Sequence, residues 1–270
     1  MAVRSVEDVK GSARQDVGRY APVNGLQLYY EIHGQGRPLV LLHGGGSSIE
    51  TTFGRIRPAL AEHHRVVAID LQAHGHTRDI DRPLTFEQDA DDVAALLPQL
   101  QIDNADFMGF SNGGMTALQI AVRHPRLVNR LVLVSTLYGR DGMQEGFWEG
   151  MQRATLETMP RPLRDAYKKV NPDPQGLQRM FERDKARMLA FQGFGETDLR
   201  AIDAPALVIN GDADVVRPEH AVALSRLLPR ARLCIVPGGH GEAIGEITWP
   251  DADGAVLRLV TTLIHDFLAS

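Results

Sequence analysis

Apolar residues in this chain gather in short continuous runs, and stretches with helical spacing separate these runs from one another. Runs of this kind are typical of strands buried on both faces, as in a parallel sheet. They occupy residues 38–42, 65–69, 105–108, 131–134, 206–209 and 231–236. Helices are predicted over residues 52–63, 85–100, 112–124, 218–228 and 252–268. Strands alternating with helices form right-handed βαβ units, so the pattern predicts an α/β fold with a mostly parallel sheet.

The beginning of the chain has a different pattern. Residues 1–18 read as a polar lead-in, and residues 26–32 alternate between apolar and polar, as a half-exposed strand does. Asn24-Gly25 lies directly before that strand, and this dipeptide is a strong hairpin signal. We therefore expect residues 19–23 to pair with residues 26–32 in an antiparallel hairpin.

The alternation of strands and helices stops between Tyr138 and Arg200, where no strand is predicted. Five of the eight methionines and four of the nine phenylalanines lie in this segment. Several of its apolar residues have the spacing of one helix face. These are Leu177, Met180, Phe181, Met188 and Phe191. The segment is therefore expected to be helical and apolar on one side.

A sharp bend is predicted around Ser111, in the sequence Gly109-Phe110-Ser111-Asn112-Gly113. A strand precedes the serine and a helix follows it, which is the arrangement of a nucleophile elbow. Glycines two residues to either side leave room for a strained serine. A glycine-rich turn from strand to helix without catalytic function is the alternative interpretation of this motif alone.

Other polar residues follow the remaining strands, and the carboxyl ends of parallel strands meet at one edge of a sheet, where ligands bind. A serine hydroxyl needs a base within hydrogen-bond reach, and His240 is the candidate. An acid must then orient the histidine. Asp214 is our candidate for that role, with Asp212 as the alternative.

Three glycines follow the strand at residues 38–42, in the sequence His43-Gly44-Gly45-Gly46. Glycines there allow backbone N–H groups to approach a developing oxyanion, together with the N–H of Asn112. The assignment among the three glycines is open by one residue. We expect His43 to orient this loop rather than to transfer protons.

Composition limits the partners of the chain. Its net charge of −5, with both signs interspersed, argues against a nucleic-acid surface. The single cysteine excludes an intramolecular disulfide, and no metal site is expected, because His74 and His76 have no third ligand at helical spacing. The first 20 residues contain no apolar core of a signal peptide, and no apolar run approaches the length of a membrane span. These features favour a cytoplasmic protein.

The chain from about Gly18 to Ser270 resembles the α/β-hydrolases. His43-Gly44-Gly45-Gly46 is similar to the oxyanion loop of that family, and the sequence from Gly109 to Gly113 is similar to its nucleophile elbow. Gly211-Asp212-Ala213-Asp214 matches the segment that carries the acid, and Gly239-His240 matches the histidine turn. The loop from Leu71 to Thr77 is also similar to a family loop, although Ala73, His76 and Thr77 depart from the usual pattern.

The resemblance implies an α/β-hydrolase fold, with an eight-stranded, mostly parallel sheet flanked by helices. Residues 1–137 and 201–270 would form the core, and residues 138–200 would form an inserted helical cap over the site. Carried over residue by residue, Ser111 is the nucleophile, Asp214 the acid and His240 the base. Asn112 and either Gly44 or Gly45 would supply the N–H groups of the oxyanion hole.

We therefore predict a hydrolase, without metal or other cofactor, that cleaves a small or medium carboxylic ester or lactone through an acyl-enzyme on Ser111. The alternatives are a carbon–carbon bond hydrolase, a cofactor-free perhydrolase or haloperoxidase, and a non-catalytic small-molecule receptor on the same fold. The expected partner is a small-molecule substrate, with neither nucleic acid nor membrane. A homodimer is compatible with the sequence.

Overall fold

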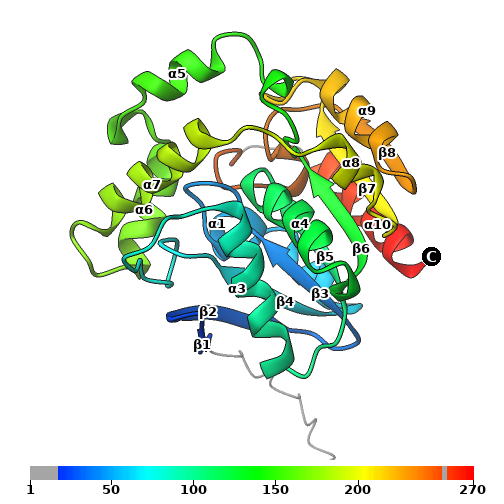
Figure 1. Ribbon diagram of the computed structural model, residues 1–270, viewed down its shortest axis with the longest axis horizontal. Helices are drawn as coiled ribbons and strands as arrows, with labels where there is room; N and C mark the ends of the chain where they lie inside the picture. Colours follow the sequence, from blue (N-terminus) through cyan, green and yellow to red (C-terminus); the bar gives the residue numbers. More distant parts are fainter. Residues whose placement is uncertain (1–17, 251–253) are drawn as a thin grey trace, which may run out of the picture.

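The computed structural model of the chain describes residues 18–250 and 254–270, and its centre is one eight-stranded sheet (Figure 1). The strands lie in the order β1-β2-β4-β3-β5-β6-β7-β8. Their bounds are β1 (Arg19–Val23), β2 (Leu26–His33), β3 (Arg37–Leu42), β4 (His64–Asp70), β5 (Ala105–Phe110), β6 (Val128–Val134), β7 (Ala206–Gly211) and β8 (Ala231–Val236).

The sheet is parallel from β4 to β8 and antiparallel at its other end. Strand β1 pairs with β2 in the predicted hairpin, and β2 pairs antiparallel with β4. All remaining neighbours are parallel. The predicted fold class, an α/β-hydrolase fold with an eight-stranded, mostly parallel sheet, is therefore confirmed.

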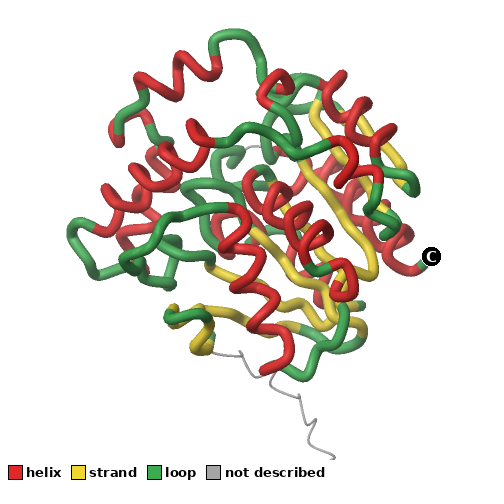
Figure 2. Tube along the Cα trace, in the orientation of Figure 1, coloured by secondary structure: helices red, strands yellow, loops and turns green. Residues whose placement is uncertain are grey.

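Helices cover both faces of the sheet, as Figure 2 shows. Helices α3 (Phe86–Gln99), α4 (Asn112–Arg123) and α9 (Pro218–Leu227) pack on one face, and α10 (Gly254–Ala269) packs on the other. In β3, Val40 and Leu42 face the first layer while Leu39 and Leu41 face the second. Because successive strand side chains point to opposite faces, burial of both faces requires the continuous apolar runs of the sequence.

Of the helices predicted over residues 85–100 and 52–63, the first forms and the second does not. The helix predicted over residues 85–100 forms as α3 and is capped by Thr85, whose side chain accepts a hydrogen bond from the Gln88 N–H at 3.0 Å. The single helix predicted over residues 52–63 is wrong: the chain forms α1 (Ile49–Phe53) and α2 (Arg57–Ala61). Pro58 has no N–H for a helical hydrogen bond to residue 54, so it fits at the start of α2 and not inside a continuous helix.

The segment between β6 and β7 contains helices α5 (Phe147–Arg153), α6 (Arg161–Val170), α7 (Gly176–Ala190) and α8 (Glu196–Arg200). Helices α5, α6 and α7 lie beyond the edge of the sheet at which the strand arrows end (Figure 1). Helix α8 instead packs against α4 and α9, and its Leu199 is buried in the core beside the sheet. The predicted cap segment, residues 138–200, thus contains three helices over the sheet edge and a fourth helix packed on the core.

Some predictions concern residues that the structure does not describe. The lead-in before Gly18 lies outside the described residues, as does the predicted start of the last helix at Ala252. Within the described ranges, no helix combines the length and apolarity needed to cross a lipid bilayer.

Candidate active site

Ser111 stands at the bend between β5 and α4 in a strained backbone conformation, with φ 52° and ψ −118°. Its N–H donates to the Val134 carbonyl at 2.9 Å, which ties the bend to the neighbouring strand. A Cβ atom on Gly109 would lie 2.2 Å from the Gly113 carbonyl oxygen, and one on Gly113 would lie 2.0 Å from the Leu42 carbonyl oxygen. Glycine is therefore required at both positions for the helix to start so close to the strands.

His240 connects Ser111 to Asp214. Its Nε2 atom lies 3.0 Å from Ser111 Oγ, and its Nδ1 atom lies 2.8 Å from Asp214 Oδ1. A carboxylate only accepts, so Nδ1–H is the donor and Nε2 is left to accept the proton of Ser111. The backbone of His240 is held as well, because Trp249 Nε1 donates to the His240 carbonyl at 2.7 Å.

Asp214 is almost completely buried, with 1% of its surface exposed. Burial raises the pKa of its carboxyl group, but the hydrogen bond and charge of His240 and the hydrogen bonds from Ser135 and Val216 lower it more, so the net pKa is lowered. Ser135 Oγ donates to Oδ2 at 2.6 Å, and the Val216 N–H donates to Oδ1 at 2.9 Å. Asp214 is thus an ionised group that can orient an imidazole and stabilise an imidazolium.

The alternative acid, Asp212, has a different place. Its Oδ1 atom accepts a hydrogen bond from the Gly238 N–H at 2.9 Å and so shapes the turn before His240. The structure brings Asp214 to the histidine, whereas Asp212 is engaged with backbone.

The glycine loop forms a turn in which the Ser47 N–H donates to the Gly44 carbonyl at 3.3 Å, and Gly46 has φ 66°. His43 holds the same carbonyl. Its Nε2 accepts from the Leu71 N–H at 3.0 Å, so the ring proton is on Nδ1 and donates to Gly44 O at 2.8 Å. Burial, together with the charge of His74, lowers the pKa of His43 to about 4, which keeps the ring neutral.

The loop lies directly against the start of α4. A Cβ atom on Gly45 would lie 2.4 Å from Asn112 Nδ2. Asn112 is the first residue of α4, where backbone N–H groups have no acceptor within the helix. The Gly46 N–H donates to Asp184 Oδ2 at 2.6 Å, so that group is already occupied. The backbone N–H groups of Asn112 and of Gly44 or Gly45 are still the predicted donors to the oxyanion.

Comparison with known proteins identifies the family of the chain. The family model of the alpha/beta hydrolase fold matches residues 37–189. The chain belongs to that family. Serine hydrolase BPHL of Homo sapiens is 28% identical over 230 residues, which cover 80% of this chain and 77% of the human protein. A 2-hydroxymuconate semialdehyde hydrolase of Pseudomonas sp. (strain CF600) is 27% identical over 276 residues, covering 94% of each chain.

A solved structure supports the same assignment. The enol-lactonase from Burkholderia xenovorans LB400 superposes with a TM-score of 0.71 and 26% identity, covering 93% of this α/β-hydrolase and 100% of the lactonase. Hydrolases of different substrates therefore share this fold with the chain.

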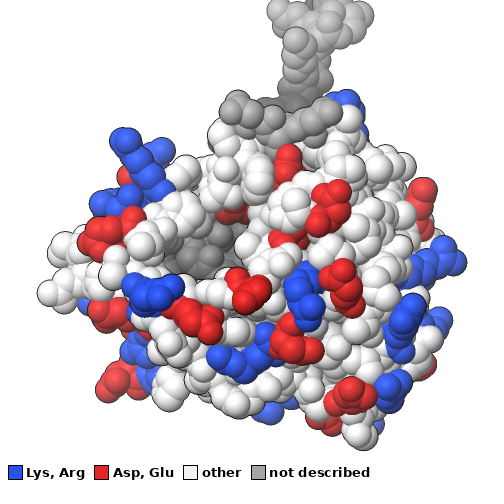
Figure 3. Space-filling model, turned by 90° about the horizontal axis from the view of Figure 1, so that it is seen from above, with Lys and Arg blue, Asp and Glu red and all other residues white. Residues whose placement is uncertain are grey.

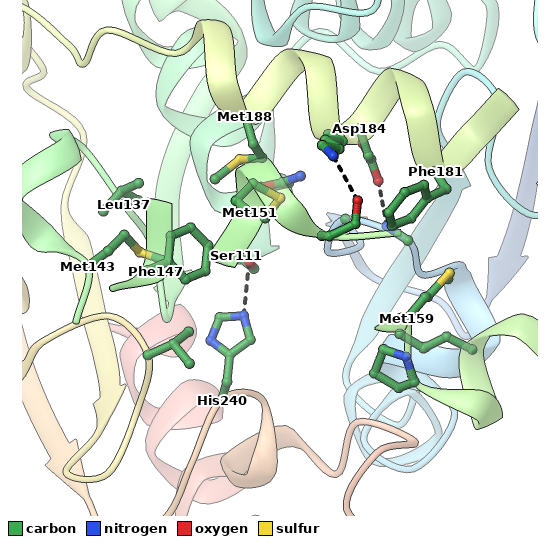
Figure 4. A pocket seen from close by; sticks show the side chains of 18 of the residues that line it. Ser111, Leu137, Met143, Phe147, Met151, Met159, Phe181, Asp184, Met188 and His240 are labelled. Atoms are coloured by element: carbon green, nitrogen blue, oxygen red, sulfur yellow. Dashed lines mark hydrogen bonds between the residues drawn. The ribbon is translucent and has the colours of Figure 1, made fainter. Parts of the chain in front are cut away.

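A cavity of about 400 Å³ opens beside Ser111, between the sheet edge and the helices above it. In Figure 4, Leu137, Met143 and Phe147 lie on one side of Ser111 and His240, and Phe181 lies on the other. All five methionines of residues 138–200 line it: Met143, Met151, Met159, Met180 and Met188. Methionine side chains are flexible and polarizable, so this wall can adapt to apolar groups of different shape.

A second cavity, of about 280 Å³, shares Gly45, Ser111, Pro160, Leu163 and His240 with the first. Its other walls are the apolar residues Phe110 and Trp249 and the polar residues Ser47, Glu246 and Thr248. Ser111 therefore stands where a larger, methionine-rich cavity meets a smaller one with a buried carboxylate.

Two residues near the site were not expected from the sequence. Ser135 follows β6 and holds Asp214, and a serine after an apolar run gives no specific signal of such a contact. Asp184, on α7, lines the larger cavity and lies 2.8 Å from His74 Nε2. His74 and Asp184 are 110 residues apart, and neither belongs to a motif that would connect them.

His74 is charged in this contact. Its Nδ1 lies 2.8 Å from the Gln72 carbonyl and its Nε2 faces the Asp184 carboxylate; both partners only accept, so both ring nitrogens carry protons. Burial lowers the pKa of His74, but the charge and hydrogen bond of Asp184 raise it more, and its net pKa is raised. Arg187 donates to Asp184 Oδ1 and, at 2.6 Å, to Asp89 Oδ2. The four side chains form a buried ionic cluster beside the glycine loop.

The close approach at the elbow predicts opposite effects for two glycine substitutions. Gly113→Ala places a methyl group against the Leu42 carbonyl, so we expect the free energy of unfolding to fall by about 3 kcal/mol. Gly150→Ala, in α5, meets nothing within 4 Å and should raise it by about 0.4–1 kcal/mol. Urea unfolding measures both, and equal stabilities of the two variants would contradict the packing argument.

Proposed function

We propose that the protein is a serine hydrolase that cleaves a small or medium carboxylic ester or lactone through an acyl-enzyme on Ser111. The observation that carries this proposal is the continuous hydrogen-bonded arrangement of Ser111, His240 and Asp214, with 3.0 Å and 2.8 Å between the heavy atoms, at the junction of two cavities. Membership of the alpha/beta hydrolase fold family is consistent with it.

In this mechanism the Ser111 proton passes to His240 Nε2 as Oγ forms a bond to the carbonyl carbon. The carbonyl π electrons move to oxygen, and the N–H groups of Asn112 and of Gly44 or Gly45 stabilise that oxyanion. Each such donor contributes about 10²–10³ in rate. Asp214 stabilises the imidazolium in the meantime.

Collapse of the tetrahedral intermediate breaks the bond to the alcohol oxygen, which takes the proton from His240 Nε2. Water then loses a proton to His240 as its oxygen bonds to the acyl carbon. The second collapse breaks the bond to Ser111 Oγ, which regains its proton from the imidazolium. The products are an acid and an alcohol, joined as a hydroxy acid when the substrate is a lactone, and no cofactor takes part.

The charges of the residues that line the two cavities support a substrate with a neutral acyl group. Lys185 is the one cation among the described residues that line the larger cavity, and its Nζ already donates to the carbonyls of Gln152 at 2.8 Å and Ala154 at 2.7 Å. Glu246 is the one acidic or basic side chain, other than the histidine His240, among the described residues that line the smaller cavity. Apart from Lys185, a substrate carboxylate would find no lysine or arginine among the described residues that line either cavity, which favours neutral esters and lactones over acidic substrates.

Carbon–carbon bond hydrolysis is the second candidate, because a 2-hydroxymuconate semialdehyde hydrolase is similar to this chain over 94% of its length. It uses the same serine environment, so a substrate panel must separate the two. We expect turnover of p-nitrophenyl esters and simple lactones. Turnover of a vinylogous diketone alone would favour the carbon–carbon reaction, and turnover with added peroxide alone would favour a perhydrolase.

Substitution of the nucleophile tests the central assignment. Ser111→Ala should lower ester kcat by about 10⁴-fold or more, because the covalent intermediate is no longer available. A fluorophosphonate probe should label the wild-type protein and Ser225→Ala, a control in α9 remote from the cavities, but not Ser111→Ala. Undiminished labelling of Ser111→Ala would refute the assignment. A protein that binds esters and is stabilised by them without turnover would instead be a receptor.

Ser135→Ala should make Asp214 less effective in orienting His240, because it removes one hydrogen bond to the carboxylate. Loss of a hydrogen bond to a charged group costs about 1.5–3 kcal/mol, so kcat/KM should fall by at least about tenfold. The Ser135 hydrogen bond helps to lower the pKa of Asp214, so its removal raises that pKa. Activity requires the ionised carboxylate of Asp214. As the medium is acidified, kcat/KM should therefore begin to decline at a higher pH in Ser135→Ala than in the wild-type protein. A pH profile of kcat/KM checks this, and an unshifted acid limb would contradict it.

A further inference from the structure

We propose that Asp184, carried by helix α7 over the site, is a positioning residue for the oxyanion loop: it fixes the Gly46 N–H and thereby the direction of the Gly45 N–H. This inference rests on the proposed function, because an oxyanion hole matters only if Ser111 attacks a carbonyl group or a similar centre. Asp184 itself forms or breaks no bond in the reaction.

The argument begins with the peptide planes on either side of Gly45. The Gly44 carbonyl and the Gly45 N–H belong to one rigid plane, and the Gly45 carbonyl and the Gly46 N–H belong to the next. His43 and the Ser47 N–H hold the first plane through the Gly44 oxygen, at 2.8 Å and 3.3 Å. Asp184 Oδ2 holds the second through the Gly46 N–H, at 2.6 Å.

These two planes are held by different parts of the chain. His43 belongs to the core beneath the loop, whereas Asp184 reaches the loop from α7, on the opposite side of the larger cavity from Leu137 and Met143 (Figure 4). A Cβ atom on Gly45 would lie 3.2 Å from Asp184 Oδ2, so the carboxylate also lies directly against the Gly45 backbone. Without Asp184, one of the two planes that fix the Gly45 N–H loses its anchor.

Asp184 is itself held in place by two cations. Its Oδ2 faces the charged His74 at 2.8 Å, and its Oδ1 accepts from Arg187, which is in turn paired with Asp89. Buried ion pairs stabilise a fold little better than apolar side chains of the same size, because the charges lose their hydration. The ionic cluster fixes the orientation of the Asp184 carboxylate. Because both of its oxygens are engaged, one lone pair of Oδ2 points at the Gly46 N–H.

The main test compares Asp184→Ala and Asp184→Asn with Glu182→Gln, an exposed carboxylate on the same helix. Asp184→Ala should lower kcat by about 10–100-fold, somewhat less than the loss of an oxyanion donor, with KM changed less than about threefold. The asparagine oxygen can still accept from Gly46, so Asp184→Asn should recover part of the loss. Glu182→Gln should retain wild-type kinetics.

The loss should be the same for acetyl, butyryl and octanoyl p-nitrophenyl esters, because all form the same oxyanion. A loss that depends on acyl length would mean that Asp184 contacts the substrate, and it would overturn the proposal. An unchanged kcat in folded Asp184→Ala, with only a lower melting temperature, would also overturn it.

Two readouts separate this proposal from the proposed function. Amide hydrogen exchange of a peptide spanning residues 43–48 should be faster in Asp184→Ala than in Glu182→Gln, whatever the natural substrate is. Phosphonylation of Ser111 by a fluorophosphonate should slow by the same factor as ester hydrolysis. If Ser111 does not react at all, the proposed function fails; if Ser111 reacts at the wild-type rate in Asp184→Ala, or exchange is unchanged, the positioning role fails.

Discussion

The site depends on a backbone constraint at Ser111. With φ 52°, this residue turns the chain from a buried strand directly into a helix, and close contacts with Leu42 and Gly113 leave space only for glycines around it. The turn places the hydroxyl beyond the sheet edge and, at the same time, directs the start of α4 toward the glycine loop. One conformational choice therefore fixes the position of the serine and of the Asn112 N–H together.

Two neighbouring histidines beside the glycine loop differ in their charge. His43 and His74 lie with their ring centroids 4.9 Å apart, yet the first is neutral and the second is charged. The difference follows from their partners: a backbone N–H donates to His43, whereas a carboxylate accepts from His74. The neutral ring of His43 binds the glycine loop from the core. The charged ring of His74 holds Asp184, which binds the same loop from helix α7. On the face shown in Figure 3, by contrast, acidic and basic side chains are interspersed around a hollow, and neither sign forms a continuous patch.

Most of the fold could be predicted from the sequence, because a strand buried on both faces needs a continuous apolar run. Glycines such as Gly109 and Gly113 indicated where two backbone segments lie in close contact. It also placed Ser111, Asp214 and His240 at one edge. Residues 52–63 were predicted wrongly because apolar spacing outweighed Pro58, whose missing N–H divides the helix. The contacts of Asp184 with Gly46 and His74 span 138 and 110 residues and depend on how α7 packs, which periodicity does not describe.

In the proposed reaction, the two cavities that meet at Ser111 also impose an order on binding and release. If the acyl group occupies the methionine-lined cavity, the smaller cavity, beside Trp249 and Glu246, is the space left for the departing alcohol. Departure of the alcohol empties the smaller cavity while the acyl group stays in place. The next nucleophile then enters through the space that the first product has left, with His240 in the shared wall. Any small alcohol that fits there would compete with water, so a geometry that permits the proposed hydrolysis would also permit acyl transfer.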